Sequence, residues 1–206
     1  MDDVHGLQLR TPTWLRASEA DRPVLSNAEW ALQAVARREQ AKSNKVALTN
    51  GTALPLLGER VELVLRPAHR TRTTLRGNQL VVAGPEHDQT QLREILEKWY
   101  RFEARGRLCE RLIELGAPLD LRPTGVTIRA QRTRWGSCNR HGGINLNWCL
   151  LLLPLTLSDY VLAHELCHLR HMNHSRAFWE LLGQLMPDYK AREVKLNDVR
   201  GAELVL

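Results

Sequence analysis

Two histidines and a glutamate stand in the pattern H-E-x-x-H, at His164, Glu165 and His168. On a helix, residues four positions apart lie on the same face, so both imidazoles can bind one zinc ion at about 2.0–2.1 Å. Glu165 follows the first histidine, so its carboxylate can reach a water at the metal without ligating the metal itself. Zinc lowers the pKa of such a water to about 7, and the carboxylate takes its proton. The pattern predicts one zinc ion and a hydrolytic reaction with Glu165 as the general base.

A catalytic zinc ion usually has three protein ligands and an open fourth position. Three side chains are candidates for the third ligand: His171, His174 and Glu193. His171 lies a further turn along the same helical face, about 7.5 Å in rise from the midpoint of the pair. Asn173 tolerates a left-handed turn, which would let the chain double back and direct His174 at the metal. We favour His174, and the other two stay open as alternatives.

The segment before His164 is apolar on nearly all sides, which predicts a helix buried in the core. Thr156 and Asp159 have the spacing of a capping box and are expected to begin this helix. Two further helices are expected after a turn, over residues 176–186 and 189–197.

Strands and one long helix are expected earlier in the chain. Apolar and polar residues alternate over residues 61–65, and Gly77-Asn78 suits a two-residue hairpin turn. Apolar residues recur at helical spacing over residues 89–115. The next strands are expected over residues 126–128, 132–138 and 144–148, followed by a buried strand over the apolar residues 148–157.

The motif and its surroundings resemble a known family. HELCH and NHSRAFW, between His164 and Trp179, are similar to segments of the YgjP-like and SprT-like zincin metallopeptidases. RWGSC at residues 134–138 and GINLNW at residues 143–148 also resemble family signatures. The resemblance covers about residues 60–200, and we place no counterpart for the first 45 residues.

This resemblance implies an α+β, zincin-like metallopeptidase domain with an N-terminal β-rich subregion and a helical C-terminal half. Carried over position by position, His164, His168 and His174 become the metal ligands, and Glu165 becomes the general base. We expect an N-terminal extension over residues 1–45, with a short helix after Ser26, and a metal-dependent hydrolase domain over residues 46–206.

Other side chains are candidates for contact with a substrate. Arg134 and Trp135 would bind substrate or line the cleft wall, and Asn145 and Asn147 would face a substrate backbone. Either Tyr189 or Arg192 would stabilise an oxyanion. Phe178 and Trp179 are instead expected in the core, where they would pack the turn of the third ligand onto the helix.

Composition indicates an ordinary globular protein, with 43% hydrophobic and 25% charged residues. The net charge of +6 favours anionic partners, and runs of arginine strengthen that expectation. The four cysteines form no C-x-x-C pair, which favours a reducing cytoplasm. The N-terminus lacks the apolar region of a signal peptide, and the apolar residues 148–157 are too few to span a membrane.

Three functions follow, in order of preference. The first is a zinc metallopeptidase whose peptide substrate lies along a strand at the edge of the cleft, expected at residues 144–148. The second is a zinc hydrolase of an anionic substrate such as a nucleoside triphosphate. The third is a protease that associates with nucleic acid. The arginines that would hold a nucleotide are Arg72, Arg129, Arg132 and Arg134.

Overall fold

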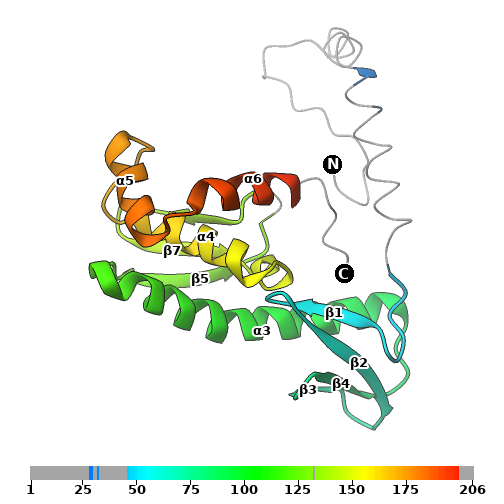
Figure 1. Ribbon diagram of the computed structural model, residues 1–206. Coiled ribbons are helices and arrows are strands. Elements are labelled where there is room, and N and C mark those ends of the chain that lie inside the picture. Colours follow the sequence, from blue (N-terminus) through cyan, green and yellow to red (C-terminus); the bar gives the residue numbers. More distant parts are fainter. Residues whose placement is uncertain (1–27, 30–31, 33–45, 132, 200–206) are drawn as a thin grey trace, which may run out of the picture. The chain divides into compact units, whose positions relative to one another are not determined.

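The computed structural model describes residues 28, 29, 32, 46–131 and 133–199 (Figure 1). The described residues from 47 onward belong to one compact unit. The helix expected after Ser26 lies outside the described residues except at three positions, and Arg132 also lies outside them. The boundary expected near residue 45 stays a prediction.

The first sheet contains four strands in the order β1-β2-β4-β3. The predicted hairpin turn is confirmed, because Gly77-Asn78 joins β3 to β4 and Gly77 has φ +56°. The alternation predicted at residues 61–65 is also confirmed, since Val61 and Leu63 are buried and Glu62 is exposed. The strand bounds are β1 Ala53–Leu56, β2 Glu59–Pro67, β3 Arg72–Arg76 and β4 Gln79–Gly84.

The long helix α3, Gln89–Gly116, confirms the helix predicted from periodicity over residues 89–115. Asp88 begins it with a capping box, in which its carboxylate accepts from the Gln91 backbone N–H and the Gln91 side chain accepts from the Asp88 N–H. Its apolar face packs against the later part of the chain, including β5 and α4 (Figure 1). The short 3-10 helix η2, Ala117–Leu119, follows it.

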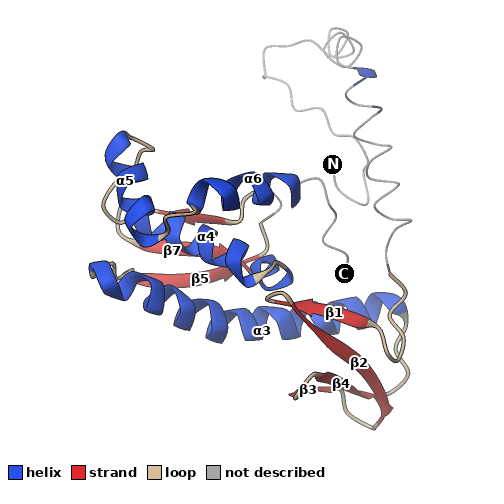
Figure 2. Ribbon diagram, viewed as in Figure 1, coloured by secondary structure: helices blue, strands red, loops and turns tan. Residues whose placement is uncertain are grey.

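A second, three-stranded sheet lies in the middle of the chain, separate from the first (Figure 2). Its strands are β5 Gly125–Arg129, β6 Gly136–Cys138 and β7 Gly143–Asn147. The order β5-β7-β6 places β7 in the centre, paired on both sides. The strand predicted at residues 144–148 is present as β7, but its predicted place at the edge of the cleft was wrong. The edge strand beside α4 is β6.

The buried strand predicted over residues 148–157 was also wrong. Residues Trp148–Leu152 form a 3-10 helix, η3. Asn147 starts this turn, because its side-chain oxygen accepts a hydrogen bond from the Cys149 N–H at 3.1 Å. The apolar side chains are nonetheless mostly buried, so burial was predicted correctly and the backbone conformation was not.

From Leu155 to Val199 the described chain forms helices and the loops that join them. The motif helix α4, Leu155–Cys167, is buried as predicted. The predicted capping box was wrong, because α4 begins after Pro154 without a side-chain cap. Asp159 instead accepts two hydrogen bonds from Arg111 of α3, at 2.8 and 2.9 Å.

Two further helices pack against α4: α5, Arg176–Leu185, and α6, Tyr189–Val199. Both were predicted, to within two residues at each end. The fold is thus mixed α+β, with sheets before the motif and helices after it. Among the described residues, no helix combines the length and the apolar character that a membrane crossing requires.

Candidate metal centre

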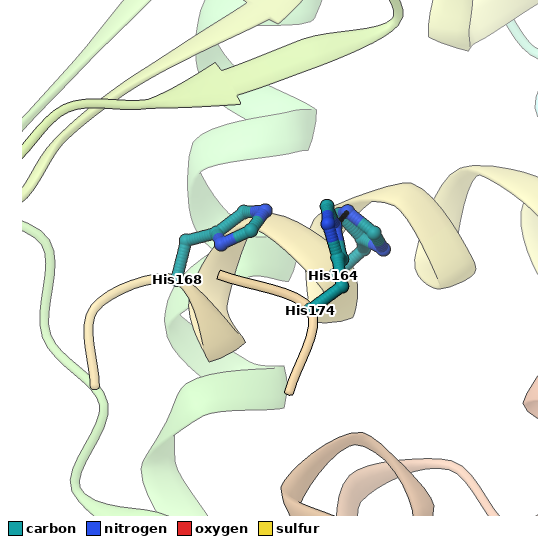
Figure 3. A group of neighbouring side chains, drawn as sticks. All are labelled: His164, His168 and His174. Carbon is teal, nitrogen blue, oxygen red and sulfur yellow. Dashed lines mark hydrogen bonds between the residues drawn. The ribbon is translucent and has the colours of Figure 1, made fainter. Parts of the chain in front are cut away.

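The three predicted histidines meet at the end of α4 (Figure 3). His164 lies in the last turn of α4, His168 is its C-cap, and His174 comes from the loop before α5. One ligand atom from each lies within 4.8 Å of the other two. The Nε2 atoms of His164 and His174 are 3.0 Å apart. Three imidazoles are thus close enough to bind one ion.

The loop after α4 brings His174 back to the helix. The helix ends at His168, whose Nδ1 donates to the carbonyl oxygen of His171 at 3.0 Å. That bond leaves Nε2 of His168 available to a metal. His171 therefore supports the site through its backbone, and its imidazole is not one of the three clustered rings.

Two aromatic residues of α5 pack under this loop, as predicted. Phe178 is fully buried, and its ring centroid lies 4.7–4.9 Å from those of His164, His168 and His174. Trp179 donates from Nε1 to the carbonyl oxygen of His174 at 3.1 Å. These contacts hold the loop and the helix in one arrangement before any metal binds.

Burial favours the neutral form of two of the imidazoles, those of His164 and His168. It lowers the pKa of His164 to about 4, with smaller contributions from His168 and His174. Burial also lowers the pKa of His168. A neutral imidazole is the form that binds a metal. The Nδ1 atom of His164 is buried and has no hydrogen-bond partner within the described part of the chain.

Glu165 is only 5% exposed and lies beside the histidines. Burial raises the pKa of its carboxyl to about 7, and the nearby Arg134 partly opposes this shift. Its Oε2 atom is buried and has no hydrogen-bond partner in the residues that the structure describes. Three imidazole nitrogen donors beside a carboxylate oxygen without a partner suit a divalent transition-metal ion and the chemistry of a general base.

Gly136 of β6 allows this carboxylate its position. A Cβ atom at Gly136 would lie 2.7 Å from both Cγ and Oε1 of Glu165, closer than real Cβ contacts occur. The edge strand therefore approaches the carboxylate only because residue 136 has no side chain. Our sequence analysis missed this role, although Gly136 lies inside the RWGSC signature.

A cavity of about 210 Å³ opens beside His164 and Glu165. Arg134 and Trp135 line it, in the position expected of substrate-contacting residues. Glu193 and Asn197 of α6 line it as well, and sequence reasoning had considered Glu193 only as a ligand. Asn145 does not line it, and its side-chain amide donates to Ser137 Oγ at 3.3 Å.

Three other residues expected to contact substrate make contacts within the fold. Asn147 is 4% exposed, and its amide donates to the carbonyl oxygens of Gln131 and Arg134. Arg192 donates to Asp188 and to the Thr156 carbonyl oxygen, both at 2.9 Å. Tyr189 stacks on Trp179, with ring centroids 5.5 Å apart. Asn147 and Arg192 are thus used within the fold, and neither Arg192 nor Tyr189 lines the cavity.

A family model matches most of the chain. Residues 1–199 match the family model described as YgjP-like, metallopeptidase domain. The match includes the first 45 residues, for which our sequence analysis placed no counterpart. No match is found among curated proteins. Among solved structures, the chain is similar to the metallopeptidase zymogen of Pyrococcus abyssi abylysin. The sequences are 25% identical, the alignment covers 45% of this chain and 92% of that chain, and the TM-score is 0.40.

Proposed function

Because the chain belongs to the family of YgjP-like metallopeptidase domains, we propose that it is a zinc-dependent peptidase. His164, His168 and His174 hold the metal, and Glu165 acts as the general base. The observation that carries this proposal is the meeting of three imidazoles beside a buried, unpartnered carboxylate. The Glu165 carboxylate is costly to bury without a hydrogen-bond partner, so its burial here points to a use in the reaction.

Each side chain has a separate part in the reaction. A bound zinc ion supplies Lewis acidity, which polarises a peptide carbonyl and makes water easier to deprotonate. Glu165 takes a proton from the attacking water and passes it to the leaving amine. In the metal-free protein, burial disfavours the charged form of this carboxyl, which favours its role as a proton acceptor. Gly136 and the buried face of α4 fix where that carboxylate lies.

The peptide substrate lies along β6. This strand pairs with β7 on one side only, so its other edge has no strand partner among the described residues. An extended peptide can add to such an edge through main-chain hydrogen bonds. Since Gly136 of β6 contacts Glu165, a peptide bound there passes close to the catalytic carboxylate.

Among the described residues, the arginines proposed to hold a nucleotide do not line one common cavity. Arg72 lines a cavity between β3 and α3, whereas Arg134 lines the cavity at Glu165. Arg129 lies exposed on β5 and lines neither. This separation favours a peptide over a nucleoside triphosphate, for which several cations should converge on the phosphates.

Two features remain proposals from the sequence. Residues 1–45 form an extension that precedes the hydrolase domain. The protein works in a reducing compartment such as the cytoplasm, in keeping with its four free cysteines.

The substrate class is tested by assaying casein and a nucleoside triphosphate side by side, with the zinc-loaded protein and with Glu165→Gln as the blank. We expect casein to be cleaved by the wild type and not by Glu165→Gln. Triphosphate cleavage that requires Glu165, with no proteolysis, would refute the peptidase and leave the metal chemistry standing.

A further inference from the structure

The cavity at the metal centre has an acidic residue that the reaction does not use. Three parts of the chain line it: residues 133–136, helix α4 and helix α6. Helix α6 contributes Glu193, Leu196 and Asn197. Glu193 shares this space with His164 and Glu165, yet it is not part of the three-histidine cluster.

Glu193 has no ion-pair partner in the part of the chain that the structure describes. Arg192, the preceding residue on α6, is already used by Asp188 and by the Thr156 carbonyl oxygen. The two lysines of this helix, Lys190 and Lys195, form no ion pair with Glu193 in the described part of the chain. Glu193 is half-buried, so water screens its charge only partly. A carboxylate in this position is stabilised when a cation reaches it.

The arginine that lines the cavity, Arg134, belongs to a different segment of the chain from Glu193. Arg134 acts on Glu165, since its charge partly opposes the effect of burial on the pKa of that carboxyl. Arg134 comes from the segment before β6, whereas Glu193 comes from α6. The cavity therefore has a positive charge beside the catalytic carboxylate and a negative charge on the α6 wall. A cationic group of the substrate would complement that wall.

The space is sufficient for such a group. The cavity of about 210 Å³ would hold roughly seven waters at about 30 Å³ each, which is enough for an extended lysine side chain. Trp135 and Leu196 also line it, and they offer apolar surface to the methylene groups of such a side chain.

We propose that Glu193 is a specificity residue that binds a positively charged group of the peptide substrate next to the scissile bond. This inference rests on the proposed peptidase function. The positive group is either a lysine or arginine side chain or a free N-terminal amine, because both present the same charge to a carboxylate.

Three peptides distinguish the two sources. The first is acetylated, amidated and carries lysine beside the cleaved bond. The second carries norleucine in its place, and the third carries norleucine there as a free N-terminus. We expect the wild type to favour a cationic peptide over the capped norleucine peptide by about 10-fold in kcat/KM. That preference should weaken at high salt.

The Glu193→Gln variant should lose most of this preference. Glu180→Gln is the matched control, because Glu180 is an exposed carboxylate on α5 that pairs with Arg176. It should keep the preference of the wild type. An unchanged preference in Glu193→Gln overturns the proposal. Loss of zinc from Glu193→Gln, measured by metal analysis, also overturns it, because Glu193 would then be a ligand.

A binding measurement separates this inference from the peptidase function. Calorimetry with zinc-loaded Glu165→Gln should show tighter binding of the lysine or free-amine peptide than of capped norleucine. Adding the Glu193→Gln substitution to the Glu165→Gln variant should remove this difference in binding. If the wild type cleaves no peptide but this difference is present, the peptidase function fails and the cation site stands. Equal binding of all three peptides overturns the cation site.

Discussion

Replacement of Gly136 by alanine tests whether β6 positions the catalytic carboxylate. The added Cβ would lie 2.7 Å from Cγ and Oε1 of Glu165, whereas ordinary contact begins near 3.4 Å. The carboxylate or the strand must therefore move by about 0.7 Å. The three atoms nearest to this Cβ all belong to Glu165, which is not among the three clustered histidines, so zinc binding should be retained.

The size of the effect follows from that movement. A misplacement of about 1 Å at a reacting group costs about 10²-fold in rate. We therefore expect Gly136→Ala to lower kcat/KM by about 10- to 100-fold, with most of the loss in kcat. Peptide hydrolysis by the zinc-loaded variant, together with its zinc content, measures this.

The matched control is Gly125→Ala. Gly125 also begins a strand of this sheet, but a Cβ there meets nothing within 4 Å. This variant should keep the activity of the wild type. If Gly136→Ala is as active as Gly125→Ala, the carboxylate is not held by the strand and our reasoning is wrong.

Three further predictions follow from the site. His174→Ala should weaken zinc affinity by at least about 10-fold, whereas His171→Ala should not, because only the backbone of His171 supports the site. Competition with a chromogenic chelator measures the zinc affinity of both variants. Equal losses of affinity would contradict the ligand set. Asn147→Ala should lower the free energy of unfolding by about 1–3 kcal/mol in urea titration, because two carbonyl oxygens lose their donor; an unchanged midpoint would contradict this role. In the metal-free protein, the Glu165 carboxyl should hold its proton up to about pH 7, because burial disfavours the charged form. Carbon-detected NMR measures this titration, and a pKa near the ordinary value of 4.5 would refute the prediction.

Local sequence patterns predicted the helices well. The apolar residues of α3 recur at helical spacing over many turns, and that signal is strong for a long amphipathic helix. The proximity of His164 and His168 was also predictable, because residues four positions apart lie on one face of a helix. The loop before α5 brings His174 back to the end of α4. The sequence favoured His174 as the third ligand but kept His171 and Glu193 as alternatives.

Other features depended on contacts between distant segments. The apolar residues 148–157 have no period that separates a buried strand from a helix, and the side chain of Asn147 decided the outcome. Strand order is also not encoded locally, so β7 was mistaken for the edge strand. Glu193 follows the motif by many residues, and only the packing of α6 on α4 brings it to the cavity.

Anomalous X-ray diffraction at the zinc edge, on crystals of the zinc-loaded protein, tests the central claim most directly. We predict one zinc ion per chain, bound by Nε2 of His164, His168 and His174 at about 2.0–2.1 Å. The carboxylate of Glu165 should lie beside the ion without ligating it. A zinc ion bound by Glu193 in place of His174, or no zinc at these histidines, would contradict the account.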